Sequence, residues 1–281
     1  MRILITGGKG MLGRTLQTEL AHHQLVIADL PEWDITSPGE FSRKLAESAP
    51  EAVIHCAAMT EVDRCETEQD LAYRVNALGS LNVAVACHRL GIRLLAISTD
   101  YVFDGTLQRP YHEFDAAGKA GTVYGASKYA GEEAIRTHCP DHVLCRISWL
   151  YGPGGPSFVH TMRKLADGSR PLLKVVDDQR GNPTSTLAVA RHLRLLLEHR
   201  ELAGTFHLTC EGEASWAEFA QEIFRLTGTP QAIAPCTSAE YPRPARRPRN
   251  SCLEKRMLRL CGLPPMPHWK EALAEFIARE F

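Results

Sequence analysis

The sequence predicts an α/β fold, with a doubly wound parallel sheet and a smaller C-terminal lobe. Two observations predict the sheet. Short strand-like runs alternate with longer amphipathic runs through the first half, and the strand-like runs are almost continuously apolar, as in Ile3–Ile5 and Leu94–Ile97. Parallel strands that are covered by helices on both faces have this continuous apolar pattern. The strand–helix alternation implies right-handed βαβ units.

The predicted elements of the first half follow one another at short intervals. We expect strands at Arg2–Thr6, Leu25–Ala28, Ala52–His55, Arg93–Ser98 and His142–Ile147. Amphipathic periodicity predicts helices between them at Met11–His22, Gly39–Ser48, Glu68–Leu90 and Tyr124–Thr137. Residues 1–150 are therefore predicted to form the sheet-based core.

The second half, residues 151–281, is less regular. It is predicted to be mostly the smaller lobe, with some segments returning to the core. The expected elements are helices at Ser157–Ala166, Thr186–Glu198, Trp216–Leu226 and His268–Arg279, and a strand at Gly204–Leu208. The proline- and arginine-rich stretch Tyr241–Asn250 resists regular structure, so it is either an ordered loop or a mobile flap.

The bulk composition excludes several classes of function. The chain has 281 residues, 44% hydrophobic and 23% charged, as is usual for a soluble globular protein. Its formal net charge of -1 gives no whole-molecule attraction to nucleic acid or to acidic membranes. The first apolar run stops at Gly7, too short for a signal-peptide core, and no stretch approaches the ~20 apolar residues of a membrane span. We therefore expect a cytoplasmic protein.

The nine cysteines are scattered along the chain, and no CxxC pair occurs. Cys139, His142 and Cys145 are close in sequence, but no fourth ligand follows at the spacing of a zinc site. We expect buried, reduced thiols and predict no metal site.

A glycine-rich turn follows the first predicted strand directly. Gly7, Gly10 and Gly13 are spaced as GxxGxxG, and Gly8 offers the alternative GxGxxG spacing. Side chains here would block the tight turn, the close approach of a pyrophosphate, or the packing of helix on strand. The helix that starts at this point presents free N–H groups and a positive dipole end to phosphates. The turn therefore predicts a Rossmann-type dinucleotide site.

Asp29 ends the second predicted strand, where a dinucleotide fold places an acid that binds the ribose hydroxyls. The alternative is a solvated aspartate at a strand end. Asp29 would repel a 2′-phosphate and so favours NADH, whereas Lys9 and Arg14 could attract one. Both NADH and NADPH remain candidate cofactors.

Tyr124 and Lys128 form a YxxxK pattern at the start of a predicted helix. Residues four apart lie on one helical face, so the phenol and the ammonium can point into the same cleft. We expect the ammonium to lower the tyrosine pKa from ~10 toward neutral pH, so that the phenol can exchange a proton with a carbonyl oxygen. Thr99 (or Ser98) follows the fourth strand at the ligand-binding edge and can hold that oxygen. The alternative is an exposed tyrosine beside a surface lysine.

These motifs resemble the extended short-chain dehydrogenase/reductases, and within them the dTDP-4-dehydrorhamnose reductase family. The resemblance covers nearly the whole chain. The matching segments are Gly7–Gly13, Ala57–Asp63, Asn76–Ala77, Ser98–Gly105, Tyr124–Lys128 with Gly131–Glu132, Arg146–Gly152, Asp178–Thr184, Gly204–Leu208 and Arg247–Ser251. The resemblance implies an enzyme that uses NADH or NADPH to reduce a nucleotide-linked 4-keto-6-deoxysugar to the 4-hydroxy sugar. Its C-terminal lobe would bind the substrate.

The resemblance also implies a role for each matching residue. Those expected to contact the cofactor are Gly7, Gly10, Met11, Leu12 and Gly13 at the pyrophosphate, Asp29, Asp34 and Ile35 at the adenosine, and Ala57, Ala58 and Thr60 toward the nicotinamide ribose. Thr99, Tyr124 and Lys128 would be catalytic, the last two also touching the cofactor. Tyr101 and Trp149 would flank the sugar, although both could instead be core aromatics.

An arginine cluster near the C-terminus consists of Arg243, Arg246, Arg247 and Arg249. Bidentate arginines suit a nucleotide diphosphate, and Arg247 is our candidate substrate residue. A nucleic-acid patch is disfavoured because aromatic residues are not interleaved with the basic ones, apart from Tyr241. A solvated loop is the remaining alternative.

The resemblance leaves several points open. Where the family often has a proline before the catalytic tyrosine, this chain has Lys119–Thr122, which puts the sugar specificity in question. Some members need magnesium for dimerisation, so Mg²⁺ and a homodimer come into consideration, and no motif here decides either. A nucleotide-sugar 4-epimerase that retains its cofactor is one alternative function. A non-catalytic cofactor-binding subunit, similar to the regulatory subunit of methionine adenosyltransferase, is another.

Overall fold

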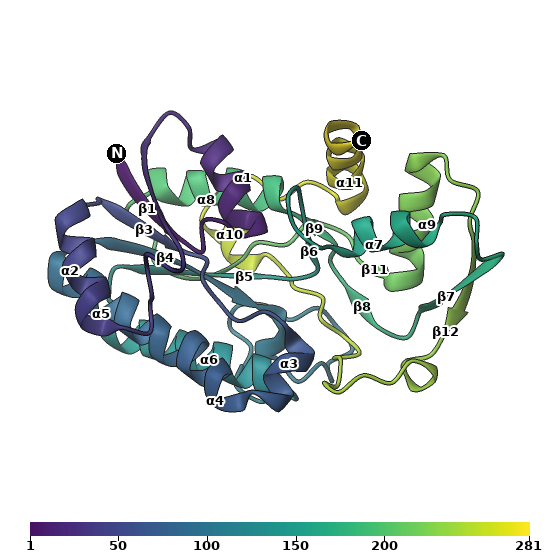
Figure 1. The fold of residues 1–281 in the computed structure, drawn as a ribbon, viewed down its shortest axis with the longest axis horizontal. Helices are drawn as coiled ribbons and strands as arrows, with labels where there is room; N and C mark the ends of the chain where they lie inside the picture. The colour runs from purple at the N-terminus through teal and green to yellow at the C-terminus, as the bar shows by residue number, and fades with distance from the viewer.

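The computed structural model describes residues 1–281 and contains a six-stranded parallel sheet with helices on both faces (Figure 1). The predicted doubly wound fold is thereby confirmed. The strand order is β10-β5-β4-β3-β1-β2. The strands are β1 (Arg2–Thr6), β2 (Gln24–Ala28), β3 (Ala52–His55), β4 (Arg93–Thr99), β5 (His142–Ile147) and β10 (Gly204–His207).

The continuous apolar runs fill two cores, because successive side chains of a strand point to opposite faces of the sheet. On one face Leu4 packs with residues of α2 (Pro38–Ser48), α5 (Ser80–Leu90) and α6 (Val123–His138). On the other face Ile3 and Ile5 pack with residues of α1 (Met11–Glu19) and α8 (Thr186–Glu198). Figure 1 shows these two helical layers on either side of the sheet.

The chain reverses its direction across the sheet at β1, because β2 is added on one side of this strand and β3 on the other. β1 pairs with β2 on one side and with β3 on the other, and all five pairings in the sheet are parallel. In open α/β sheets ligands bind outside the carboxyl ends of the strands at such a switch point. The loops that follow β1 and β3 are therefore the walls of the expected site.

The long helix predicted at Glu68–Leu90 is wrong in one respect, because the segment is divided. The structure has α3 (Val62–Thr67), α4 (Gln69–Tyr73), a π-helical turn at Arg74–Gly79, and then α5. The turn places Asn76 in the interior, where its amide bonds both the N–H and the carbonyl of Met59 (2.8 and 3.1 Å) and the Ser127 hydroxyl (3.0 Å). Such turns are frequent at functional sites. Through Asn76, this turn hydrogen-bonds both the loop after β3, at Met59, and α6, at Ser127.

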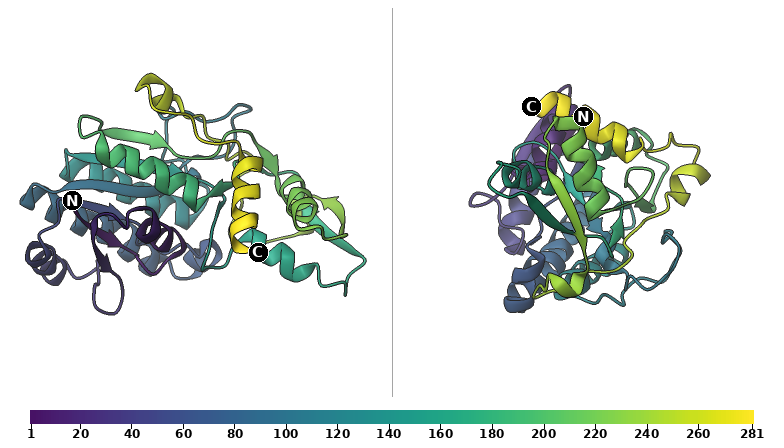
Figure 2. Two further views of the ribbon diagram at one scale, coloured as in Figure 1. Left: turned by 90° about the horizontal axis from the view of Figure 1, so that it is seen from above. Right: turned by 90° about the vertical axis from the view of Figure 1, so that its right-hand side faces the viewer.

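The C-terminal lobe contains three two-stranded pairings and the helices around them (Figure 2). The pairs are β6 (Leu150–Tyr151) with β9 (Thr184–Ser185), β7 (Leu172–Val176) with β12 (Ala232–Cys236), and β8 (Arg180–Gly181) with β11 (Ala214–Ser215). The helices are α7 (Phe158–Leu165), α9 (Trp216–Thr227) and α11 (Trp269–Glu280), whereas α10 (Arg256–Leu260) packs against β10 of the main sheet. Segments α8 and β10 lie in the layers of the main sheet.

The stretch Tyr241–Asn250 is an ordered loop. The backbone N–H of Ala245 donates to Asp63 at 3.1 Å, and the Asn250 amide donates to the carbonyls of Leu107 and Arg109 (2.8 and 2.9 Å). The loop thus crosses from the lobe to the segments that follow β3 and β4. None of the helices combines the length and the apolar character that a membrane span requires.

Candidate active site

A cavity of about 630 Å³ lies at the carboxyl edge of the sheet, outside β1, β3 and β4. It brings together nearly all of the residues predicted for the site. These are Gly7, Gly10, Met11, Leu12, Gly13, Asp29, Asp34, Ile35, Ala57, Ala58, Thr60, Thr99, Tyr101, Tyr124, Lys128 and Trp149. Arg247 does not line this cavity.

The glycine turn forms a cradle of bare backbone. Gly7 has a φ of +64°, and a Cβ added there would lie 2.7 Å from the backbone nitrogen of Ala57, at the end of β3. The N–H of Gly10 bonds the Gly7 carbonyl at 3.0 Å and closes the turn. No side chain caps the start of α1 at Met11, so its free N–H groups face the cavity. The cradle therefore fits the pyrophosphate of a dinucleotide.

Asp29 is tied to the glycine turn and is not a solvated strand end. Its two carboxylate oxygens accept the backbone N–H groups of Lys9 and Leu30 at 2.7 and 2.8 Å. The Lys9 ammonium donates to the Leu30 carbonyl at 2.7 Å. Nearby, Asp34 accepts the N–H and hydroxyl of Thr36, both at 2.8 Å. These contacts shape the outer end of the cavity, where an adenosine would lie.

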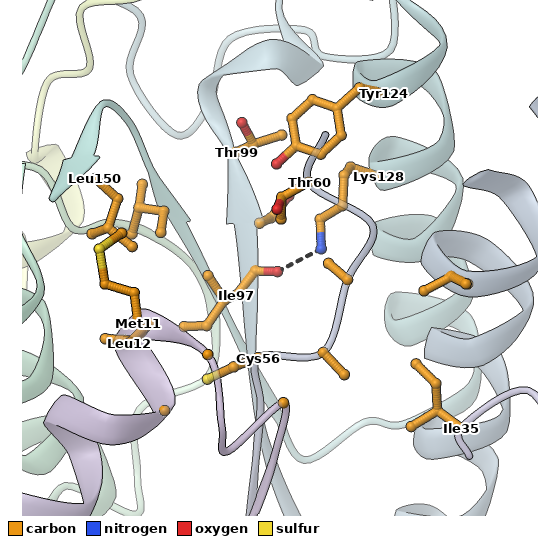
Figure 3. A pocket seen from close by; sticks show the side chains of 18 of the residues that line it. Met11, Leu12, Ile35, Cys56, Thr60, Ile97, Thr99, Tyr124, Lys128 and Leu150 are labelled. Carbon is orange, nitrogen blue, oxygen red and sulfur yellow. Dashed lines mark hydrogen bonds between the residues drawn. The ribbon is translucent and has the colours of Figure 1, made fainter. Parts of the chain in front are cut away.

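Tyr124 and Lys128 project from the first turns of α6 into the cavity, toward Thr99 at the end of β4 (Figure 3). All three residues are buried: Tyr124 is 9% exposed, Lys128 6% and Thr99 5%. Thr122 caps this helix by accepting the Gly125 N–H at 3.0 Å. The Lys128 ammonium donates to the Ile97 carbonyl at 2.8 Å. The alternative of an exposed tyrosine with a surface lysine is therefore wrong.

The expected lowering of the Tyr124 pKa toward neutral pH is also wrong. Burial raises the pKa of the Tyr124 phenol well above its ordinary value, and the Thr99 hydroxyl opposes this only weakly. Burial lowers the pKa of the Lys128 ammonium to about 8, although the negative charge of Glu132 acts to raise it. The phenol is therefore held in its protonated form, as a proton donor.

Glu132 anchors the back of α6. It is buried, and its two oxygens accept the Arg146 guanidinium at 2.9 and 2.7 Å. Burial would raise the pKa of Glu132, but the bonds and charges of Arg146 and Arg136 outweigh it and lower the pKa to about 2. This ion pair fixes α6 against β5, one turn beyond Lys128.

Trp149 and Tyr101 stand where the first cavity meets a second one of about 380 Å³, which lies in the C-terminal lobe. Trp149 has a φ of +46°, and its indole stacks on Trp216 with ring centroids 3.5 Å apart. Gly181 backs this indole so closely that an added Cβ would lie 2.6 Å from Trp149 Nε1. Tyr101 packs edge-to-face on Tyr124 at 5.4 Å. Both aromatic residues therefore face cavities and are not simply core residues.

The predicted arginine cluster is divided between two cavities. Arg243 and Arg247 line the second cavity, whereas Arg246 and Arg249, with Arg247 again, line a third, polar one of about 660 Å³. One guanidinium nitrogen of Arg247 donates to Asp63 at 2.8 Å and to the Ala245 carbonyl at 2.9 Å. The sequence could not show this division because it depends on how the loop crosses to α3.

Three residues of the site were missed in the sequence. Trp216 was assigned only to a helix, yet it backs Trp149 and bonds Gln179 through its indole N–H at 3.0 Å. Asp100 was taken only as part of a matching segment, although it bonds Thr99. Asn76 was likewise part of a motif, and no local signal distinguished its buried amide.

The residues of the chain do not form a metal centre by themselves. No three His, Cys, Asp or Glu side chains come together as ligands of one ion. Cys139 and Cys145, which are close in sequence, lie in the cores on opposite faces of the sheet.

Comparison with known proteins agrees with this geometry. The family described as RmlD substrate binding domain matches residues 1–281. A dTDP-4-dehydrorhamnose reductase of Streptomyces griseus is 42% identical, covering 98% of this chain and 92% of the relative. Solved structures of dTDP-4-dehydrorhamnose reductases from Clostridium acetobutylicum and from Bacillus anthracis, the latter in complex with NADP, both superpose with a TM-score of 0.96. They are 43% and 39% identical, and each match covers 99% of both chains. The chain therefore belongs to the dTDP-4-dehydrorhamnose reductase family of extended short-chain dehydrogenase/reductases.

Proposed function

We propose that this protein uses NADH or NADPH to reduce a nucleotide-linked 4-keto-6-deoxysugar, of the dTDP-4-dehydrorhamnose kind, to the 4-hydroxy sugar. One observation carries the proposal: the protonated Tyr124 phenol stands beside Thr99 in the first cavity and packs on Tyr101, which also lines the second cavity. One cavity has the glycine cradle and the other has aromatic walls. The names of the relatives, and the NADP in the Bacillus anthracis structure, support the same chemistry.

The proposed mechanism assigns the proton to the protein. A reduced nicotinamide, when bound, supplies the hydride for C4 of the sugar. Tyr124, whose raised pKa keeps the phenol protonated at neutral pH, gives its proton to the C4 oxygen as the hydride arrives. Lys128 holds the Ile97 carbonyl and keeps a positive charge near the phenolate that forms, and Thr99 binds the reacting oxygen.

We assign the remaining contacts from the position of the cavities. Residues 1–150 would bind the cofactor, and residues 151–281 would contribute most of the substrate site. The sugar would lie between Tyr101 and Trp149, with the nucleotide in the second cavity. Arg243 and Arg247 line that cavity and would meet the diphosphate.

The test is consumption of NADH and NADPH with a panel of nucleotide-linked 4-keto-6-deoxysugars, followed by identification of the product. We expect one NAD(P)H consumed for each 4-hydroxy sugar formed, with cofactor that exchanges freely. Co-purified NAD that does not exchange, with interconversion of C4 epimers and no net consumption, would instead identify an epimerase. Tight cofactor binding without turnover of any sugar would identify a regulatory subunit.

A further inference from the structure

Asp100, the residue that follows Thr99, carries a buried carboxyl group that the mechanism above does not use. It is 3% exposed. One oxygen, Oδ1, accepts the Thr99 hydroxyl at 2.9 Å, and the other, Oδ2, is buried without any hydrogen-bond partner. The nearby Ser251 hydroxyl donates at 3.2 Å to the Arg180 carbonyl. The Ser251 hydroxyl and the backbone N–H groups of Asp100 and Tyr101 also favour the carboxylate, but together with Thr99 they do not compensate its burial.

No cation compensates the carboxyl group either. Lys128 donates to the Ile97 carbonyl, and Arg247 pairs with Asp63. Tyr101 and Tyr124 are the titratable neighbours of Asp100, and the charged or titratable groups beside these two tyrosines are Asp63, Cys65 and Arg247, with Lys128 in the same cavity. Burial outweighs the hydrogen bonds and raises the pKa of Asp100 to about 7. Both protonation states are therefore accessible near neutral pH.

The protonation state of Asp100 matters because the Thr99 hydroxyl has a single proton. While Thr99 donates that proton to a carboxylate, its oxygen can only accept a hydrogen bond. A keto oxygen has no proton, so it needs donors as negative charge develops on it during reduction. The alcohol formed by reduction does have a proton, which it can donate to the Thr99 oxygen.

We propose that Asp100 is a positioning residue that sets the direction of the Thr99 hydrogen bond. As a neutral acid, Asp100 donates to the Thr99 oxygen, and the freed Thr99 hydroxyl donates to the keto oxygen alongside Tyr124. As a carboxylate, Asp100 accepts the Thr99 proton, and the Thr99 oxygen then accepts from the substrate alcohol. Because reduction and the reverse oxidation share one transition state, neutral Asp100 favours turnover in both directions and ionised Asp100 slows both. The inference rests on the proposed function, since it concerns the same reacting oxygen.

The test compares Asp100→Asn with the wild-type enzyme between pH 6 and 8.5, in both directions. Asparagine keeps the shape and can donate to Thr99, but it cannot ionise. We expect the wild-type kcat/KM, relative to the variant, to fall about tenfold over this range in both directions, since both directions use the same transition state. Because the Lys128 titration affects both proteins, it cancels in the ratio. A ratio that does not change with pH in either direction would overturn the proposal.

Two further variants show whether Asp100 acts through Thr99. In a Thr99→Val background, which lacks the hydroxyl, the Asp100→Asn substitution should no longer change the pH profile. An undiminished effect there would contradict the proposal. Thr99→Val alone should also lose the part of the kcat/KM pH profile that depends on Asp100. This comparison with the wild type decides the question if Asp100→Asn does not fold. Asp167→Asn makes the same chemical change in an exposed loop and should match the wild type.

An infrared measurement separates this inference from the proposed function. The wild-type protein should show the carbonyl stretch of a protonated carboxyl at pH 6 that is lost by pH 8.5 and is absent from Asp100→Asn. A carboxyl that is already ionised at pH 6 would sink the inference even if the enzyme reduces keto sugars. Conversely, failure to reduce any keto sugar would refute the function and leave the infrared result standing.

Discussion

The two cavities of the site are built in different ways. The cofactor side is made of backbone, since the glycine turn after β1 meets the end of β3 at Ala57. The substrate side is made of side chains from distant segments: Trp149 stacks on Trp216, and Arg247 bonds Asp63, which lies 184 positions earlier. A backbone cradle depends on a few consecutive residues. Walls of side chains depend on the complete fold, so the two sides should respond differently to substitution.

Tyr124→Phe should have the largest effect, because the phenol supplies the proton of the proposed reaction. We expect kcat to fall at least ~10²-fold, since the proton donor is lost, while the affinity for NAD(P)H stays nearly unchanged. Steady-state kinetics and cofactor titration measure the two quantities. Tyr129→Phe removes a hydroxyl from the same helix outside the cavity and should have little effect. Unchanged turnover in Tyr124→Phe would remove the catalytic assignment.

Gly7→Ala should test the backbone side. The new Cβ would overlap the backbone of Ala57 in a left-handed conformation, so the cradle must open. We expect cofactor affinity to fall roughly 10- to 100-fold, with a loss of stability of about 1–2 kcal/mol or more. Gly39→Ala, in α2, meets no atom within 4 Å and should leave the affinity unchanged. Equal behaviour of the two variants would mean that the cradle does not bind the cofactor.

Asp29→Ala should sharpen the cofactor preference. It removes a carboxylate that would bind ribose hydroxyls and repel a 2′-phosphate, so affinity for NADH should fall about tenfold and for NADPH by less. The bond to the Lys9 N–H is also lost, so a small common decrease is expected. Titration with both cofactors measures the difference. An equal loss for both would show that Asp29 only supports the glycine turn.

Gly181→Ala should test the substrate cavity, whose walls are side chains, without changing the binding of the cofactor. Its Cβ would displace the Trp149 indole from its position on Trp216. We expect KM for the nucleotide sugar to rise about fivefold, because a wall residue moves while the proton donor stays in place. The affinity for NADH should not change. A parallel loss of cofactor affinity would argue against separate cofactor and substrate walls.

The sheet was the most predictable part of the fold. The predicted ranges of β1, β3 and β5 are those observed, because their side chains fill two cores and leave a continuous apolar signal. The strands β7 and β12 were missed. Their residues alternate between buried and exposed or carry a proline, and each strand has only the other as a partner. Pairing of this kind is decided by tertiary position, which a local pattern does not contain.

The same distinction applies to the site. The positions of the glycine turn and of the Tyr124–Lys128 pair were predictable because each is a short motif on one element. The direction of the phenol pKa was not, since burial depends on how α6 packs against the rest of the molecule. The partnerless oxygen of Asp100 is equally invisible in sequence, because Ser251, over 150 residues later, completes its surroundings.

The stacked indoles of Trp149 and Trp216 also give the molecule a built-in optical probe. Parallel rings at this separation couple their electronic transitions, so a sugar ring that shifts one of them changes the near-ultraviolet circular dichroism. Trp33 lines the cofactor cavity and is not part of the stacked pair, so its fluorescence can respond to the dinucleotide. The order in which the two ligands arrive can therefore be followed without any added label.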